Sequence, residues 1–146
     1  MKTPIISMVV MLLLFSSFAL ACPPLLYNRN RVSDDDLERF KTIINQIPED
    51  YFKGIEVITI RNRNHNIYNF LGYFSFKSYR TYITIFQFNN QTNQEVCETL
   101  LHELGHDKEY FLLSRYLSVL EISKKGLSED YAEEFRMEYN YLCENG

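Results

Sequence analysis

Residues 102–106, which read HELGH, constrain this chain more than any other feature, because they form an H-E-x-x-H pentapeptide inside an apolar run that spans 96–110. Residues four apart lie on one face of a helix, so His102 and His106 can reach one Zn²⁺ from the same side. Glu103 then lies beside the open metal position, where a carboxylate can take a proton from bound water. Two of the 3 histidines in the chain belong to this segment. The pattern therefore predicts a metal site on a helix rather than two unrelated surface histidines.

A catalytic zinc ion has three protein ligands and one open position, so a third ligand must come from elsewhere. The remaining histidine, His65, lies in a polar loop and is predicted to be a surface residue. Glu129 and Glu133 are better placed, since they lie four apart at the start of a predicted helix, where one can bind metal and the other can hydrogen-bond a ligand imidazole. An acidic helix start that only suits the helix dipole is the alternative. We expect Glu129 to be the ligand, in preference to Glu133, Asp130 and Asp107.

The N-terminal residues 1–21 have the features of a secretory signal peptide: Lys2, an apolar stretch over 5–20 and an A-x-A cleavage site at 19–21. An uncleaved membrane anchor is the alternative, although about 16 apolar residues are slightly short for a span. Cleavage would leave Cys22 as the first mature residue, and 19–22 is an imperfect match to a bacterial lipobox. The sequence thus predicts a secreted or extracytoplasmic protein, with lipidation of Cys22 as its only expected membrane tether.

The composition is that of a single globular domain, with 46% hydrophobic and 23% charged residues. The formal net charge is −4 and falls to −5 when 1–21, with one lysine and no acid, are removed. An acidic domain without a basic stripe argues against nucleic-acid binding. We expect a monomer whose partner is a peptide or protein substrate.

The 3 cysteines leave the disulfide pattern open. Export permits disulfides, and Cys97 can pair with Cys143 if Cys22 is lipidated. However, if the helices that carry HELGH and Glu129 were straight and antiparallel, the two cysteines would lie roughly 13 Å apart along the helix axes at 1.5 Å per residue. A bridge needs Cα atoms within about 7 Å, so pairing of Cys22 with either partner is equally open.

Local patterns predict the order α-β-β-β-α-α-α. Ser33 is expected to cap a first helix that ends before Pro48, and strands are expected over 55–60, 67–76 and 79–88. The HELGH helix should begin at Thr92 or Asn93. The stretch 108–125 is also helical in pattern, and whether it continues that helix or follows a break near 105–107 is open. Gly126 is expected to end this region, and Ser128 to cap a final helix.

These elements predict an α+β fold with a zincin-like arrangement. A small, mainly antiparallel sheet of about three strands would pack on the N-terminal helix, the HExxH helix and a C-terminal glutamate helix. The predicted organisation is a signal peptide at 1–21, an extended arm at 22–33 and the folded domain at 34–146.

HELGH followed by 129–135, with the pattern E-x-x-A-E-x-F, resembles the gluzincin group of zinc metallopeptidases, including small single-domain zincin-like peptidases and the catalytic core of lethal-factor-type toxins. The stretch from 72–75 to 82–85 resembles the hairpin that precedes their active-site helix, and the resemblance covers roughly 35–142. It implies Zn²⁺ bound by His102, His106 and Glu129, with Glu133 supporting a histidine and Glu103 acting as general base. It also implies that an edge strand binds extended peptide, and we expect the edge of strand 79–88 to do so.

The chain departs from larger gluzincins in having no second subdomain, and no residue is assigned to stabilise an oxyanion. Tyr131 and Tyr139 are candidates for that role, although packing is the simpler role for each. Two other functions remain open: a zinc-binding zincin-like protein that acts as a binding module without peptidase activity, and a metal-free structural domain.

Overall fold

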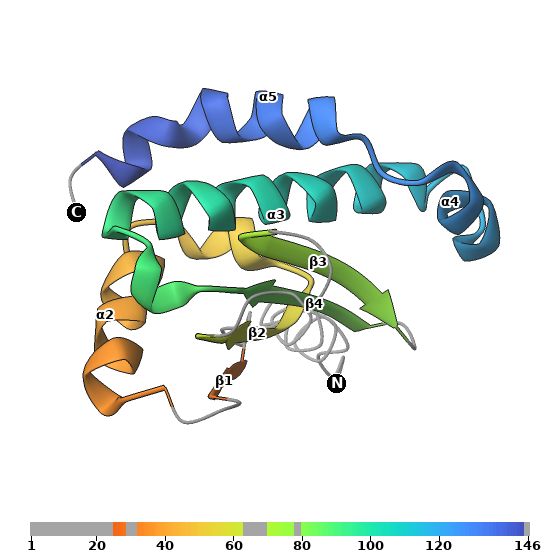
Figure 1. Ribbon diagram of the computed structural model, residues 1–146. Helices are drawn as coiled ribbons and strands as arrows, with labels where there is room; N and C mark the ends of the chain where they lie inside the picture. The colour runs from red at the N-terminus through yellow and green to blue at the C-terminus, as the bar shows by residue number, and fades with distance from the viewer. Residues whose placement is uncertain (1–24, 29–31, 63–69, 78–79, 145–146) are drawn as a thin grey trace, which may run out of the picture.

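The computed structural model describes residues 25–28, 32–62, 70–77 and 80–144 (Figure 1). The predicted signal peptide, Cys22 and His65 lie outside the described residues. The described part has an α+β fold. Its strands are β1 (Leu25–Asn28), β2 (Ile55–Ile60), β3 (Gly72–Lys77) and β4 (Arg80–Ile85). Its helices are α2 (Asp34–Ile44), α3 (Asn93–Leu113), α4 (Val119–Lys125) and α5 (Glu129–Tyr139), with 3-10 turns η1 (Glu49–Phe52), η2 (Phe88–Asn90) and η3 (Asn140–Cys143).

The four strands form one mixed sheet in the order β1-β2-β4-β3. β2 pairs in parallel with both β1 and β4, and only the β3–β4 hairpin is antiparallel. The prediction of a mainly antiparallel sheet was therefore wrong. α2 forms the crossover connection between the parallel strands β1 and β2. In the β3–β4 hairpin, the second strand rather than the first pairs with β2, so this pair is parallel as well. The expected edge strand was also wrong: β4 is paired on both sides, and among the described strands β1 and β3 lie at the edges of the sheet.

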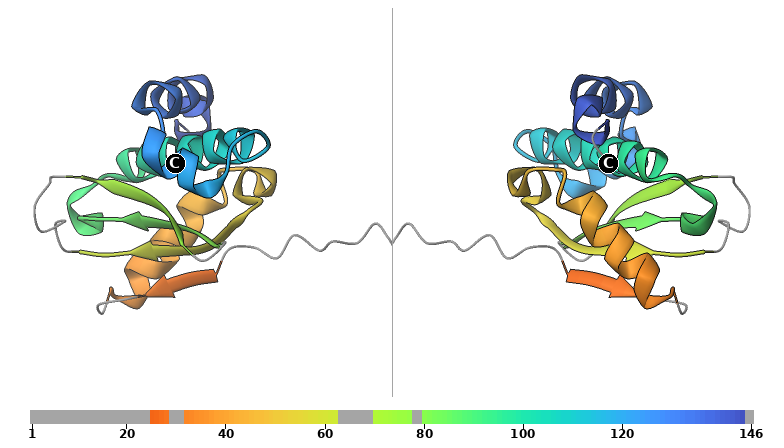
Figure 2. Two further views of the ribbon diagram at one scale, coloured as in Figure 1. Left: turned by 90° about the vertical axis from the view of Figure 1, so that its right-hand side faces the viewer. Right: turned by 90° about the vertical axis from the view of Figure 1, so that its left-hand side faces the viewer.

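The molecule has three layers, with α3 covering the sheet and α5 lying along the outer side of α3 (Figures 1 and 2). Alternate residues of the central strands, such as Ile58 and Ile83, are buried and form a single apolar core with α2 and α3. From α3 the core receives Val96, Leu100, Leu101 and Leu104. Leu104 of HELGH faces the core and is fully buried.

Side-chain caps fix the ends of the helices where the sequence predicted them. Ser33 and Ser128 accept hydrogen bonds from backbone N–H groups in the first turns of α2 and α5, and Thr92 forms a capping box with Glu95 at the start of α3. Gly126, with a φ of 76°, ends α4.

The structure decides one helix boundary that the sequence left open, and it shortens one predicted strand. α3 continues through 105–107 to Leu113, so the HELGH segment lies inside one unbroken helix, and a separate short helix follows. The strand expected over 79–88 ends at Ile85, because Gln87 adopts the left-handed conformation (φ 50°) and turns the chain into η2.

α3 and α5 are in direct backbone contact at Gly105. A Cβ atom built on Gly105 would lie 2.7 Å from the Cα of Ala132 and 3.1 Å from its carbonyl oxygen. Gly105 leaves room for a neighbouring backbone, and the small Ala132 side chain allows the approach. This contact determines how closely the glutamates of α5 approach the histidines of α3.

A disulfide between Cys97 and Cys143 joins the far ends of the same two helices, with Cα atoms 5.6 Å apart. The straight-helix estimate overstated their separation, because α5 ends at Tyr139 and η3 folds the last residues towards α3 (Figure 1). Both cysteines are buried in the core.

The Gly105–Ala132 contact can be tested with Gly105→Ala. In an isolated helix this change stabilises by about 1 kcal/mol, whereas here the added methyl group must push α5 away. We expect a loss of roughly 1–3 kcal/mol in the free energy of unfolding, measured by urea denaturation, together with weaker zinc binding. Gln94→Ala, at an exposed position of α3, is the control and should change stability little. A stabilised Gly105→Ala protein would contradict the contact.

Candidate metal centre

The two histidines of HELGH lie one turn apart on the side of α3 that faces α5. Their ring centroids are 4.9 Å apart. His106 is buried, with 9% of its side chain exposed, and His102 is more open at 22%. The neighbouring position, Gly105, carries no side chain that could separate α5 from the two rings.

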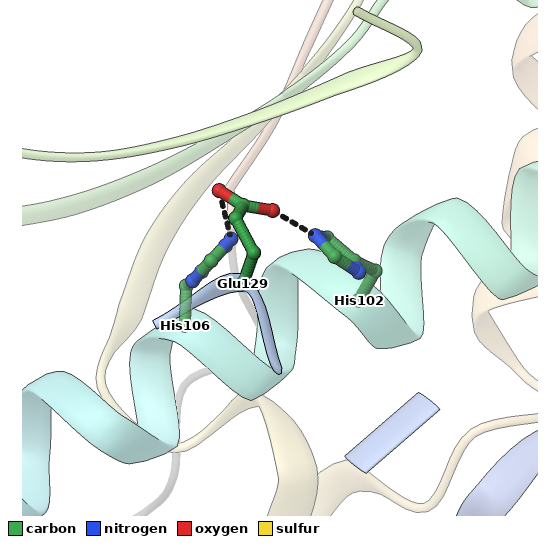
Figure 3. Close-up of side chains that lie close together, drawn as sticks. All are labelled: His102, His106 and Glu129. Carbon is green, nitrogen blue, oxygen red and sulfur yellow. Dashed lines mark hydrogen bonds and ion pairs between the residues drawn. The ribbon is translucent and has the colours of Figure 1, made fainter. Parts of the chain in front are cut away.

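Glu129 is the first residue of α5, and its carboxylate lies between the two imidazoles (Figure 3). One oxygen is 3.1 Å from His102 Nε2, and the other is 3.5 Å from His106 Nε2. One donor atom from each of the three residues lies within 4.8 Å of the others, an arrangement that can hold a metal ion. The structure thus brings together the three residues expected to bind zinc.

The start of α5 is held in place by α3. The backbone N–H of Ser128 donates to Glu109 Oε2 at 2.5 Å, and the Ser128 hydroxyl accepts from the Tyr131 N–H. Glu109 is itself buried. This carboxylate, three residues after His106, therefore fixes the position from which Glu129 reaches the site.

Glu133 lies one turn after Glu129, at the other nitrogen of His102. Its Oε2 is 3.6 Å from His102 Nδ1. A carboxylate on this side of the ring can orient the imidazole so that its Nε2 faces a metal ion. Arg136 binds both oxygens of Glu133 at 2.6 and 2.9 Å and also reaches Glu98 on α3 at 3.0 Å. This ion pair holds the pKa of the Glu133 carboxyl below its usual range.

His106 has an apolar neighbour. The Phe74 ring of β3 lies 6.5 Å from its imidazole, and burial lowers the pKa of His106. Among the described residues, the buried Nδ1 has no hydrogen-bond partner. An imidazole kept neutral by burial suits metal ligation, because only the neutral ring offers a lone pair.

Glu103 is packed between α3 and the edge strand. A Cβ atom on Gly72 would overlap Oε1 of Glu103 and would lie 2.8 Å from its Cγ and from Thr99 Cγ2, so a larger residue there would displace these side chains. Burial and, to a smaller degree, the negative charge of Glu129 raise the pKa of Glu103 to about 8, against the opposing effect of a hydrogen bond from the Phe74 backbone. A cation held by the triad would lower this pKa by favouring the charged carboxylate.

The candidate triad opens into a cleft of about 700 Å³ between α3, β3 and the start of α5. Phe70, Leu71 and Leu127 supply its apolar walls. Its charged lining is mainly acidic, with Arg136 as the basic side chain and five glutamates: Glu95, Glu98, Glu103, Glu129 and Glu133.

The edge of β3 runs along this cleft. The Phe86 N–H donates to the Leu71 carbonyl at 2.8 Å, so the backbone groups of Leu71 point towards β4. Since these groups alternate along a strand, those of Gly72 and Phe74 point away from β4, beside Glu103.

The donor set fits Zn²⁺. Two imidazoles and one carboxylate converge, a buried ring is held neutral, and a further carboxylate lies against the other nitrogen of His102. No known family model matches the chain, and no significant match was found among curated proteins or solved structures.

The other candidate ligands lie outside the triad. Asp107 is buried, and its carboxylate lies near Gly54 and 3.5 Å from Lys108 Nζ. Asp130 is exposed. Of the two tyrosines considered for oxyanion binding, Tyr139 packs against Tyr51 and Phe135, and neither lines the cleft.

Sequence reasoning missed Glu109, Arg136 and the role of Gly72. Arg136 follows Glu133 by three residues, a helical ion-pair spacing that the sequence displays. A glycine inside a strand is a known signal of close approach, whereas which group approaches is decided by tertiary packing.

Metal-free protein should lose stability as the pH rises from 6.5 to 8. In this range the unfolded chain has released the Glu103 proton (ordinary pKa 4.5), whereas the folded state retains it up to about 8. The pKa of His106 is lowered from 6.5 in the folded state, so the proton that the unfolded chain still releases above pH 6.5 offsets a small part of this loss. With EDTA present, the free energy of unfolding should fall by roughly 1–2 kcal/mol over this range.

Glu103→Gln is the control for this pH dependence. It keeps the acceptor for the Phe74 N–H and has no proton to lose, so its stability should be nearly constant over the same pH range. Equal slopes for the wild type and this variant would contradict the assignment to Glu103.

Zinc affinity should distinguish the two glutamates of α5. Glu133→Ala should weaken zinc binding by roughly 10–100-fold, the usual effect of removing a residue that orients a ligand. Glu129→Ala should weaken it considerably more, because a ligand is lost. Competition with a colorimetric chelator measures both values, and the reverse order would transfer the ligand role to Glu133.

Proposed function

We propose that this chain is an exported, zinc-dependent metallopeptidase with a zincin-like fold of the gluzincin type. The observation that carries the proposal is the convergence of His102, His106 and Glu129 beside a buried glutamate, in a cleft bordered by the outer side of β3. His102, His106 and Glu129 would hold the ion. When bound there, Zn²⁺ supplies Lewis-acid chemistry: it lowers the pKa of water and polarises a carbonyl.

Glu103 would act as general base. Its carboxylate lies next to His102 in the chain and lines the cleft. It takes the proton of the attacking water and passes it to the leaving amine. Contacts with Gly72 and the Phe74 N–H hold this side chain in one orientation, which reduces the entropy lost on reaching the reactive geometry.

The substrate would be an extended peptide that pairs with the outer edge of β3. The outward backbone groups of Gly72 and the Phe74 carbonyl offer hydrogen bonds to an added strand, and they lie beside Glu103, which already accepts from the Phe74 N–H. The apolar walls at Phe70, Leu71 and Leu127 would receive its side chains.

A second candidate is a zinc-binding module without peptidase activity. One observation favours it: among the described residues that line the cleft, no tyrosine is present and both histidines belong to the triad, so the side chains that often stabilise an oxyanion are missing. Such a protein would bind zinc with the same three residues and bind peptide without cleaving it.

Glu103→Gln tests the peptidase proposal. The variant should retain zinc, because the ligands are unchanged, and should lose roughly 10²–10⁴-fold in kcat/KM on a quenched-fluorescent peptide library. Thr99→Ser, a change beside Glu103 in the cleft that keeps the hydroxyl, is the control and should retain most of the activity.

A Glu103→Gln protein as active as the wild type would remove Glu103 from the mechanism. A zinc-loaded wild-type protein that binds library peptides and cleaves none would favour the binding module.

A further inference from the structure

Large apolar side chains are concentrated at the end of the molecule formed by the last turn of α3 and by α4. Ten large hydrophobic side chains are exposed in the described part of the chain, and five of them fall within ten consecutive residues. They are Phe111 (58% exposed), Leu112 (44%), Tyr116 (85%), Val119 (44%) and Leu120 (64%). We call this group the apolar tip. Side chains of this size and exposure mark an interaction surface.

Exposed basic residues surround the apolar tip. Arg115, Lys124 and Lys125 are all exposed, and the Arg115 guanidinium lies 5.2 Å from the centre of the Phe111 ring. This arrangement contrasts with a whole-chain net charge of −4.

Two acids lie in this part of the chain. Glu109 is buried and accepts from the Ser128 N–H, whereas Glu121 is exposed and accepts from Ser118 in the capping box of α4. The exposed side chains of 111–125 therefore carry three positive charges and one negative charge beside the apolar residues.

We propose that the apolar tip is a membrane-docking surface that inserts into the interface of a bilayer containing anionic lipids. Phe, Tyr and Leu side chains enter the boundary between headgroups and acyl chains, while Arg and Lys bind anionic headgroups around them. Among the described residues, no helix is long and apolar enough to span a bilayer. The proposed attachment is peripheral, and it differs from the tether expected at Cys22.

A second copy of the chain suits this surface less well. A two-fold contact would place Arg115, Lys124 and Lys125 of each copy against the same residues of the other, and like charges oppose such pairing. An anionic bilayer instead complements both the apolar and the basic components.

Docking at the tip leaves the cleft open. The residues that line the cleft end at His106 on α3 and resume at Leu127, so none belongs to the apolar tip. The surface also requires no metal, so this proposal stands or falls independently of the peptidase.

The absence of tryptophan from the chain allows a local test. Tyr116→Trp places one fluorophore in the tip of the full-length protein. Its emission should shift to shorter wavelength with phosphatidylcholine vesicles that contain phosphatidylglycerol, and lipids with brominated chains should quench it. Tyr141→Trp, 54% exposed near the C-terminus, is the matched control and should show neither effect. Because the signal is local, attachment through the apolar N-terminal stretch does not mimic it.

Substitutions in the Tyr116→Trp background test each component. Lys124→Gln with Lys125→Gln should raise the half-saturating concentration of anionic lipid roughly 30-fold, about 5-fold for each charge. Phe111→Ser with Leu120→Ser should abolish the shift, and Met137→Ser, at an exposed site on α5, should preserve it. Glu129→Ala should also preserve it, which separates this result from the fate of the metal site.

Three results would overturn the proposal. The first is an unshifted emission of the Tyr116→Trp protein with anionic vesicles, and the second is an equal response to vesicles of phosphatidylcholine alone. The third is a concentration-dependent rise in molecular mass that Phe111→Ser with Leu120→Ser removes, because it would make the tip a contact between copies.

Discussion

The close contact between α3 and α5 at Gly105 and Ala132 is the interaction on which the candidate site depends. No zinc ligand set exists on α3 alone, because two histidines leave the coordination incomplete. Glu129 reaches the two histidines only because its helix lies against α3 with no side chain between them. A Cβ atom on Gly105 would lie 2.7 Å from the Cα of Ala132. The Ser128–Glu109 hydrogen bond and the Cys97–Cys143 disulfide fix the two ends of this pairing.

The same pairing concentrates negative charge. Five glutamates and one arginine line the cleft around the two imidazoles, and Arg136 is already committed to Glu133 and Glu98. Repulsion from Glu129, added to burial, raises the pKa of Glu103. Glu103 is the buried member of this group, whereas Glu95 and Glu129 are exposed. A cation held by the triad would favour the charged form of Glu103 and offset the repulsion from Glu129.

The sequence predicted features that are decided locally and missed those decided by long-range packing. Ser33, Thr92 and Ser128 act within one turn, so the helix starts could be predicted, and the β-branched alternation of Ile55–Ile60 identified β2 residue for residue. Strand order could not be predicted, because parallel pairing of β2 with β1 and β4 leaves no mark in either segment alone. For the same reason the edge strand was misassigned, and the partner of Cys97 remained open.

Helix α3 connects the candidate site to the proposed docking surface over a short distance. Phe111 follows His106 by five residues, which places it roughly 8 Å further along the helix axis at 1.5 Å per residue. A protein docked through the apolar tip would therefore hold its cleft close to the headgroups. Since the cleft opens along β3 and the start of α5, it would remain accessible to extended chains at the membrane surface. The peptides best placed to reach it would be segments that emerge from the same membrane. The short distance between the cleft and the headgroups would then limit which substrates are cleaved as much as the side-chain preferences of the cleft do.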